Sequence, residues 1–408
     1  MTASSALIRL PVVRVVARHP FVRIAFARDA RRLAAGGLVG RFREAGTGLA
    51  IVLAVHGSAG SYAVAGTAGA AYLLAAAVSR PAHGRLVDKT GGRRGLLGAS
   101  LANSLALAGL AVAVWVHGRD GLLLAASAAI GLTLPALSAA LRALWPQVIA
   151  GPQDEAYAFD TLLYETSLII SPACVGLIAT LASAPAALIV LACAGTLGTA
   201  IVATAPAART ARAVTAGPAA ERLLSRLVIT VITVTLFSGF AEGSMTVIVP
   251  AFASHHHQAA AAGPLLAALA CGCLAGSLGY GLLARRGRWP GRLVTCACAL
   301  TLTCAGLAGL SHGIIVFGVL LAATGVTLAP TLTTGFVAIQ QTAPPASLAE
   351  AFTWASFCAS AGAASAQALA GNLIAHLGVT IALWLPAAAA AATAGTAILT
   401  RRLYRAPR

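Results

Sequence analysis

Residues 62–94 read YAVAGTAGAAYLLAAAV, then SRPAH, then GRLVDKTGGRR. An unbroken apolar stretch is thus followed at once by a short segment with five lysines and arginines. A helix needs about 20 apolar residues to cross a bilayer core of roughly 30 Å, because only helices or closed barrels satisfy all their backbone groups in hydrocarbon. The stretch therefore predicts a membrane-spanning helix that ends in a charged hairpin.

The same alternation of apolar and basic segments recurs along the chain. Continuous apolarity excludes a transmembrane barrel, whose strands run only about 9 to 11 residues. We predict an all-α membrane protein with twelve transmembrane helices. The predicted spans are Leu33–Val55, Tyr62–Val78, Leu96–Val116, Leu122–Leu144, Tyr157–Leu181, Ala186–Thr204, Leu227–Phe252, Pro264–Leu283, Leu293–Leu310, Ile314–Ile339, Ala351–Ile374 and Thr380–Leu399.

The composition agrees with a membrane protein. Of the 408 residues 59% are hydrophobic and 10% are charged, whereas soluble domains average about 25% charged residues. A water-soluble surface cannot be built from this composition. Soluble enzymes, disordered tails and nucleic-acid-binding modules are therefore excluded.

The 28 lysines and arginines, set against 11 acidic residues, give a formal net charge of +17. They gather in the two termini and in the even-numbered hairpins, and positively charged loops stay on the cytoplasmic side. The opposite loops hold Arg119, which Asp120 neutralises, and the run His255–His257. We therefore expect a multi-pass protein of the inner (plasma) cell membrane with both termini in the cytoplasm. The excess charge needs no nucleic-acid partner.

Internal similarity predicts two parallel halves. FREAG at residues 42–46 resembles FAEGS at 240–244, and EAYAF at 155–159 resembles EAFTW at 350–354, at nearly the same separation along the chain. Duplicated bundles are common in transporter folds. No signal peptide is visible near the start. The predicted plan is a basic tail at 1–32, a six-helix bundle at 33–205, a linker at 206–226, a second six-helix bundle at 227–400 and a tail at 401–408.

The basic hairpin after the second span carries a family motif. Its key residues are Gly84, Asp88, Lys89, Gly91, Arg93 and Arg94. A glycine, an aspartate four residues on, a basic residue, a second glycine and a basic cluster resemble the signature hairpin of the major facilitator superfamily, although Gly92 stands where that pattern has a basic residue. The two glycines permit a tight turn and close helix approach. The resemblance implies two pseudo-symmetric six-helix bundles that carry a substrate by alternating access.

A second motif lies in the fifth span. The sequence SPACVG at residues 171–176 is similar to a glycine- and proline-containing motif of antiporters in this superfamily, with Ser171 and Val175 in place of glycines. Pro172 is also explained by a kink at a helix contact. The wider sequence is similar to bacterial efflux-type members, which implies export.

Ionisable residues inside the spans are the strongest functional candidates, since each costs about 2.5 to 3.5 kcal/mol on insertion scales. Glu44 in the first span and Glu242 in the seventh occupy matching places. We predict that Glu242 faces a central cavity and binds a proton or a cation. Glu44 has two explanations: a cavity residue, or an ion pair with Arg41 on one helix face.

Charged residues near the cytoplasmic ends are candidates for gating. Asp160 and Glu165 share the fifth span, and Arg142 near the end of the fourth span is a possible partner of either. This cluster is either a structural or gating pair or a substrate contact. Glu350 and Asp88 lie at cytoplasmic ends of opposite halves, and with an arginine such as Arg93 between them they would lock an outward-facing state.

Aromatic and amide side chains complete the candidate cavity. They are Tyr164, Phe240, Gln340, Gln341 and Trp354, and core packing also explains each of the aromatic ones. Trp145 and Trp384 are expected to be interface anchors, and the cysteines to be small packing residues. No phosphate loop, dinucleotide site or zinc spacing is present, so we expect no cofactor and no metal.

The leading hypothesis is a secondary transporter that exports a small apolar or cationic compound in exchange for protons and works as a monomer. One alternative is a facilitator or symporter for uptake of a polar metabolite, which a cavity rich in side-chain amides would support. Another is a polytopic membrane enzyme acting on lipid-linked substrates, for which His255–His257 form the one histidine cluster.

Overall fold

The computed structural model describes residues 28–90, 92–148, 153–205, 226–283, 289–342 and 348–405. Every regular element in these ranges is a helix. Ten helical segments of the described chain are long and apolar enough to cross a membrane. The two other predicted spans lie in α4 and α16, helices of 32 and 30 residues. The prediction of an all-α multi-pass membrane protein is therefore confirmed.

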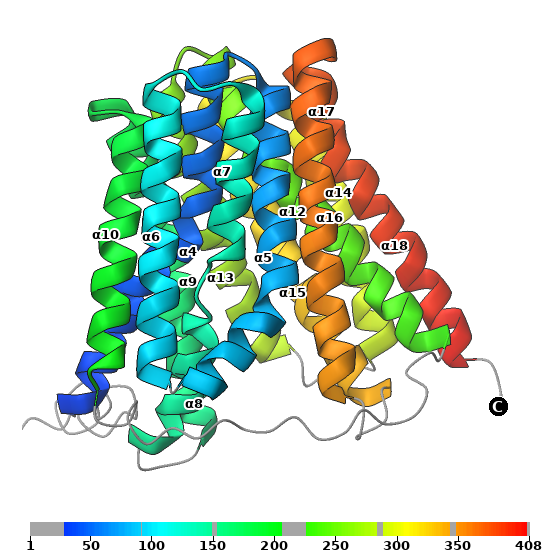
Figure 1. The fold of residues 1–408 in the computed structure, drawn as a ribbon. Helices are drawn as coiled ribbons and strands as arrows, with labels where there is room; N and C mark the ends of the chain where they lie inside the picture. Colours follow the sequence, from blue (N-terminus) through cyan, green and yellow to red (C-terminus); the bar gives the residue numbers. More distant parts are fainter. Residues whose placement is uncertain are drawn as a thin grey trace, which may run out of the picture.

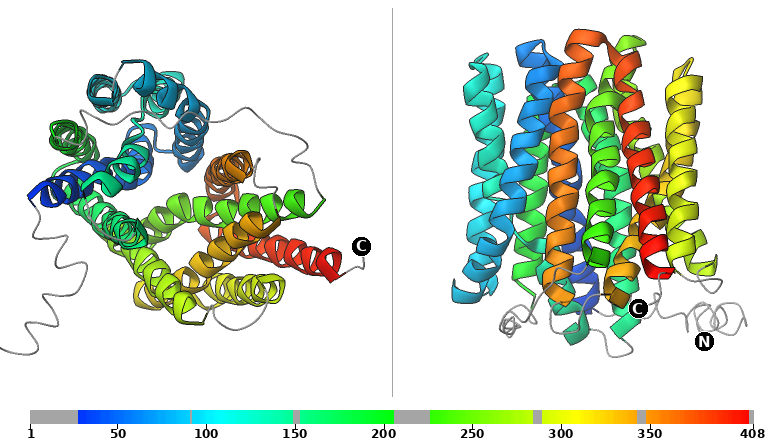
Figure 2. Two further views of the ribbon diagram at one scale, coloured as in Figure 1. Left: turned by 90° about the horizontal axis from the view of Figure 1, so that it is seen from below. Right: turned by 90° about the vertical axis from the view of Figure 1, so that its right-hand side faces the viewer.

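The helices form two groups that follow the order of the chain (Figures 1 and 2). The N-terminal group contains α4 (Arg28–Ala59), α5 (Tyr62–Thr90), α6 (Gly92–Trp115), α7 (Asp120–Leu132), α8 (Leu137–Val148), α9 (Gln153–Leu181) and α10 (Ala184–Ala203). The C-terminal group contains α12 (Arg226–His255), η1 (Ala259–Ala261), α13 (Ala262–Leu283), α14 (Trp289–Leu310), α15 (Ile314–Thr342), α16 (Leu348–Leu377), α17 (Val379–Ala382) and α18 (Trp384–Arg405). The groups meet chiefly where α5 packs on α16 and α9 packs on α13.

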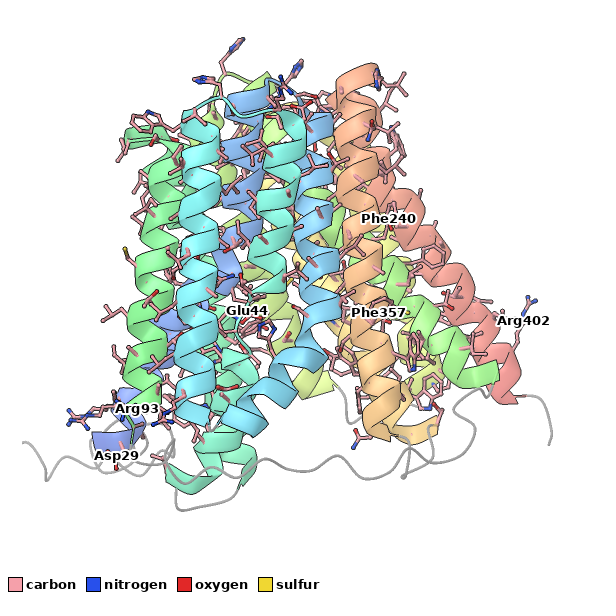
Figure 3. All side chains as sticks on the ribbon, in the orientation of Figure 1. Asp29, Glu44, Arg93, Phe240, Phe357 and Arg402 are labelled. Carbon is pink, nitrogen blue, oxygen red and sulfur yellow. The ribbon has the colours of Figure 1, made fainter. Side chains whose placement is uncertain are left out.

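The two ends of the helix assembly differ in composition. One end carries Arg31, Arg32, Arg93, Arg94, Arg401 and Arg402, and we call it the arginine-rich end. The other carries His56, His117, His255, His256, His257, His312 and His376, with Arg119 beside Asp120, and we call it the histidine-rich end. Figure 3 shows Asp29 and Arg93 at the first end and Glu44 further up, inside the helix assembly.

Short caps turn the chain at the histidine-rich end. Ser183 caps α10 by accepting a hydrogen bond from the Ala186 amide at 3.2 Å, which satisfies one of the free amides of the first turn. Gly60 follows α4 with φ of 67°, a left-handed conformation that suits glycine. The turn at Gly60 sets α4 and α5 antiparallel, and the turn at Ser183 does the same for α9 and α10.

The fourth predicted span is broken, contrary to expectation. Helix α7 ends at Leu132 and α8 starts at Leu137, with Pro135 between them. Proline has no backbone N–H and disfavours helical geometry in the residue before it, so the helix stops there. The twelfth span is also divided, at Leu383, into α17 and α18. Helix α18 runs beyond the predicted end to Arg405.

The basic hairpin also differs from its prediction. Helix α5 continues through Gly84, Asp88 and Lys89 as far as Thr90, and α6 starts at Gly92. The predicted turn at Gly84 is therefore wrong, because arginine, leucine and lysine sustain a helix beyond the apolar stretch. Gly91 lies outside the described residues, as do the side chains of Asp88 and Lys89.

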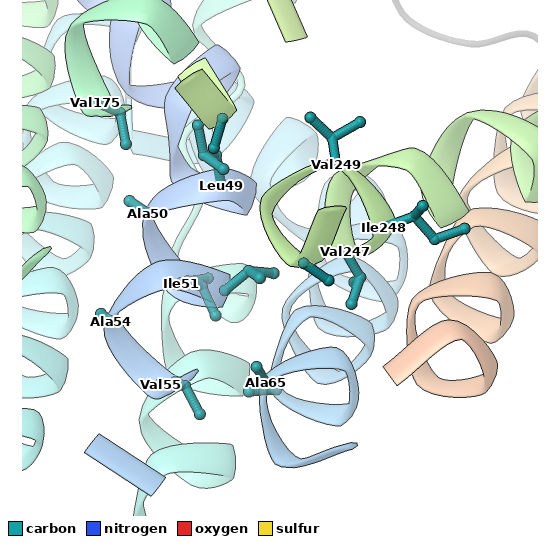
Figure 4. Packing of buried hydrophobic residues seen from close by; sticks show 14 of the residues in the cluster. Leu49, Ala50, Ile51, Ala54, Val55, Ala65, Val175, Val247, Ile248 and Val249 are labelled. Atoms are coloured by element: carbon teal, nitrogen blue, oxygen red, sulfur yellow. The ribbon is translucent and has the colours of Figure 1, made fainter. Parts of the chain in front are cut away.

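The apolar core is shared at one end and divided at the other. Near the histidine-rich end, one cluster combines Leu49–Val55 of α4 with Val247–Val249 of α12, Ala65 of α5 and Val175 of α9 (Figure 4). Near the arginine-rich end, each group has its own cluster, one around Trp145 and one around Trp289. The two groups are thus packed together at the histidine-rich end and separate toward the arginine-rich end.

Candidate functional site

A cavity of about 410 Å³ lies where the two groups separate. Helices α4, α5 and α9 line it from one group, and α12, α13, α15 and α16 line it from the other. Its polar residues are Glu44, Tyr72, Tyr164, Glu242, Thr246, Cys273, Ser360 and Gln367, and no lysine, arginine or histidine is among the described lining residues. The remaining wall is mostly leucine, alanine and glycine. This size and mixture suit a small ligand with few polar contacts.

Glu44 and Glu242 enter this cavity from opposite groups. Glu44 lies on α4 and Glu242 lies on α12, where its side chain is exposed. The structure thus places both glutamates of the helix interior in the lining of one cavity. Two glycines hold the backbone beside Glu242 close to α16: a Cβ atom at Gly239 or at Gly243 would overlap Ala359 or Ala363. The position of Glu242 is therefore fixed by close helix packing.

The partner of Arg41 is Asp160 and not Glu44. The Arg41 guanidinium lies 2.8 Å from the Asp160 carboxylate and also donates to the Asp160 carbonyl oxygen at 3.1 Å. Both side chains are buried, with 0% and 2% of their surface exposed. The rotation of α4 decides which acid pairs with Arg41, because it turns Arg41 toward α8 and α9, where Asp160 lies. The ion pair that would have neutralised Glu44 is absent among the described residues.

Ser138 connects this ion pair to the cavity. Arg41 donates through Nε to the Ser138 hydroxyl at 3.3 Å, and Ser138 donates to Glu44 at 3.0 Å. The indole of Trp145 donates to Asp160 at 2.6 Å. Ser138 and Trp145 share one face of α8 because they are two turns apart. The break before α8 thus positions two side chains that no periodic pattern of the fourth span indicates.

Trp145 corrects a sequence prediction. It is fully buried in the cluster near the arginine-rich end, so it is no interface anchor. The carboxylate of Asp160 supplies the partner that its N–H needs when buried. Trp384, by contrast, is 53% exposed, as an anchor requires. The side chain of Arg142, the predicted partner of Asp160, lies outside the described residues.

Arg43 is a second buried arginine in α4. It faces away from the cavity and donates to the Ser100 hydroxyl of α6 at 3.1 Å. Gly195 of α10 makes room for it, since a Cβ there would overlap the guanidinium. Arg43 therefore leaves the cavity without a basic side chain.

The other predicted site residues divide into two sets. Tyr164 and Pro172 line the cavity, and Glu165 lies on the same helix between them. Phe240, Gln340, Gln341 and Trp354 do not line it; Trp354 is exposed and packs edge-on against Phe357 at 6.0 Å. Glu350 lies in the first turn of α16, with its side chain outside the described residues, and Arg93 and Arg94 are exposed at the start of α6.

The sequence analysis did not name as candidates five polar residues of the cavity lining: Tyr72, Thr246, Cys273, Ser360 and Gln367. Gln367 is a buried amide in the middle of α16, and its side-chain oxygen has no hydrogen-bond partner in the described structure. An amide in such a span is a signal that could have found it. Cys273 lines the cavity beside Glu242, and nothing in the sequence distinguishes it from seven other cysteines.

Glycine crossings close the cavity at the histidine-rich end. A Cβ atom at Gly66 of α5 would overlap the backbone oxygen of Gln367, and one at Gly371 of α16 would overlap that of Tyr62. Gly176 of α9 contacts Gly263 of α13 in the same manner. Small residues allow this close approach of helices in membranes. The cavity is thus closed at this end and opens toward the arginine-rich end.

Replacing Gly371 with leucine is expected to force α5 and α16 apart. Overpacking of this kind costs about 1 to 3 kcal/mol, which shifts the protein away from the described conformation. Spin labels on cysteines introduced at Arg119 and His376, both exposed at the histidine-rich end, would report a longer distance. Gly395→Leu is the matched control, since nothing lies within 4 Å of a Cβ there. An unchanged distance in Gly371→Leu would refute the role of this crossing in closure.

Comparison with known proteins identifies the family. Residues 33–307 match the model of the Major Facilitator Superfamily. No curated protein matches the sequence. Solved structures that resemble the chain include the nucleoside transporter NupG (D323A mutant), with a TM-score of 0.75 and 13% identity over 91% of this chain and 99% of that one.

Two other similar structures belong to transporters with different names. A bacterial homologue of the iron transporter ferroportin, in an inward-facing state, has a TM-score of 0.72 and 15% identity over 92% of this chain and 99% of that one. The POT family transporter PepTSo has a TM-score of 0.69 and 13% identity over 93% and 99%. At such identities the likeness concerns the fold alone. With the family match over most of its length, the chain belongs to the Major Facilitator Superfamily of membrane transporters.

Proposed function

We propose that this protein is a secondary active transporter that exports a small apolar or cationic compound in exchange for protons. The observation that carries the proposal is the cavity between the two helix groups, with Glu44 on one side, Glu242 on the other and no basic side chain in its described lining. A cation is stabilised by such a wall and an organic anion is repelled. Two bundles that rock about this cavity would expose it to each side in turn.

The sidedness follows from the distribution of charge. The arginine-rich end, placed in the cytoplasm by the positive-inside rule, is the end toward which the cavity opens. The conformation is then inward-facing and ready to receive a cytoplasmic compound. Uptake of a polar metabolite would be favoured by amides, but Gln367 is the one amide of the described lining against two carboxylates. The enzyme alternative has no support from a metal site: no group of three potential ligands occurs in the described part of the chain.

The test is transport by the purified protein in lipid vesicles with an imposed pH gradient. Vesicles are loaded with members of a panel of fluorescent organic cations, neutral compounds and organic anions. We expect cations or neutral compounds to cross the membrane in the direction opposite to the protons, and anions to stay inside the vesicles. Transport that ignores the gradient, or that favours anions, would refute the proposal.

The negative charge of the cavity also predicts how fast charged reagents modify the Cys273 thiol. In a protein with the other seven cysteines replaced by alanine, a cationic methanethiosulfonate reagent is expected to modify Cys273 about tenfold faster than its anionic counterpart, because charged clefts concentrate ions of opposite sign. The rate is measured by mass spectrometry. A protein that keeps only Cys304, which is 0% exposed, is the unreactive control. Equal rates for the two reagents would refute an acidic cavity.

A further inference from the structure

Glu165 lies on α9 next to Tyr164, which lines the cavity. Leu168 and Pro172, three and seven residues further on, line the cavity, and this spacing puts all three residues on one helix face. Glu165 is therefore the member of this face nearest the arginine-rich end. Its Oε2 atom is buried and has no hydrogen-bond partner among the described residues. A buried carboxylate oxygen without a donor is costly, so it requires a proton or an ion that the protein atoms do not supply.

Helix packing places Glu165 and Cys273 at the same depth. The crossing of α9 and α13 is fixed where Gly176 meets Gly263. From that contact, Glu165 and Cys273 each lie about three turns, roughly 16 Å, toward the arginine-rich end. The two residues are thus at the same depth on facing helices. Cys273 lines the cavity together with Glu242, so the same region receives Glu165 from α9 and Glu242 from α12.

Electrostatics agree with this placement. Glu165, Glu242 and Cys273 lie within electrostatic range of one another. Glu44 is engaged elsewhere, since its carboxylate accepts from Ser138. Glu165 is therefore the glutamate of the N-terminal group that keeps a buried carboxylate oxygen without a partner among the described residues near Glu242.

The remaining titratable groups near this pair do not neutralise it. From the packed helices they are Arg41, Arg43 and Glu44 of α4, Tyr72 of α5, Asp160 and Tyr164 of α9, Cys193 of α10, Cys271, Cys273 and Tyr280 of α13, and Cys358 of α16. Arg41 is bound by Asp160 and Arg43 by Ser100. The Tyr280 ring lies under Arg292, away from the cavity lining. No arginine or lysine side chain in the described structure makes an ion pair with either glutamate.

We propose that Glu165 and Glu242 share one proton across the two helix groups and together form the coupling-ion site. Two neighbouring carboxylates in a medium of low dielectric do not both ionise, because each charge opposes the other. A carboxyl–carboxylate hydrogen bond satisfies the unpartnered oxygen of Glu165 and ties α9 to α12. This inference rests on the proposed function, for which it names the second member of the proton site.

The pair explains how proton release and a change of conformation can be linked. When a cationic compound enters the inward-facing cavity from the arginine-rich end, the hydrogen bond between the glutamates is lost. The O–H bond of the protonated carboxyl then breaks, the proton goes to water and both side chains become carboxylates. A cationic compound can take the place of the proton between them. One site thereby holds either the proton or the compound, as exchange requires.

Infrared spectroscopy tests the pair without any need for transport. A pH titration of the purified protein in membranes follows the C=O band of protonated carboxyl groups. We expect Glu165→Gln and Glu242→Gln each to remove the same titrating band, and the double variant to remove no more. Glu44→Gln is the matched control and should keep the band. Retention of the band in Glu165→Gln, or its loss on adding sodium at constant pH, would overturn the shared proton.

Transport measurements form the second arm of the test. In Glu165→Gln, gradient-driven flux should fall to the level of protein-free vesicles, as is also expected for Glu242→Gln. Both variants should still exchange labelled for unlabelled compound. Glu165→Asp, which keeps the charge, and the thermal unfolding midpoint of each variant show whether folding is intact. Normal gradient-driven flux in Glu165→Gln would refute the pair and leave the proposed function standing. A native protein that transports nothing would refute the proposed function, and the infrared band would still decide whether the pair exists.

Discussion

Glu242→Gln is expected to reduce proton-driven transport to the level of protein-free vesicles. The substitution keeps the shape of the side chain and removes its ability to bind and release a proton. Because Glu242 faces the cavity from α12 and its neighbours Gly239 and Gly243 hold that helix against α16, no nearby residue of α12 can replace it. Net export against a pH gradient, followed by the fluorescence of the released compound, measures the effect.

Exchange of labelled for unlabelled compound separates coupling from binding. This exchange needs no net movement of protons, so Glu242→Gln should retain it. Asp120→Asn is the matched control: it makes the same chemical change at an exposed acid of the histidine-rich end and should transport normally. If Glu242→Gln still exports against the gradient, Glu242 is not the proton site.

Of the substitutions considered, Arg41→Met is expected to lower the free energy of unfolding most, by about 3 to 5 kcal/mol. Removing one partner of a buried ion pair leaves the other charge unpaired in a low-dielectric interior. Here Asp160 would retain the Trp145 indole as a donor but would lose the bonds that Arg41 makes to its carboxylate and its carbonyl oxygen. The unfolding midpoint in detergent, followed by tryptophan fluorescence, should fall by many degrees.

A double variant distinguishes the ion pair from simple packing. Arg41→Met with Asp160→Leu removes both charges, and apolar replacement of a buried pair is often neutral. The double variant should therefore recover most of the lost stability. Arg402→Met, at an exposed position of the arginine-rich end, should leave the midpoint unchanged. Equal losses in the single and double variants would show that the shape of Arg41, and not its charge, stabilises this region.

Sequence reasoning predicted most of the fold because each spanning segment is a local property. A run of apolar residues crosses the bilayer wherever it occurs, and basic residues collect between such runs. The breaks at Pro135 and at Leu383 were missed, although the first has a local cause. The extension of α5 through Gly84 was missed because the motif resembles a turn, whereas the residues around it sustain a helix.

The candidate site was only partly predictable. The scarcity of acids in the spans pointed to Glu44, Glu165 and Glu242, since a charge in hydrocarbon is costly wherever the helix faces. The same reasoning could not exclude Phe240 or Trp354 from the cavity, because aromatic side chains are tolerated on every face of a membrane helix.

By itself, the sequence determined that this is a multi-pass helical protein with a charge asymmetry between its ends and a few acids within its spans. Tertiary structure alone decided that Arg41 binds Asp160, that Ser138 binds Glu44, and that Glu242 and Cys273 share one cavity. The physical reason is helix rotation. In spans rich in alanine, leucine and glycine no periodic pattern fixes which face turns inward, so partners are chosen only when the glycine crossings bring the helices together.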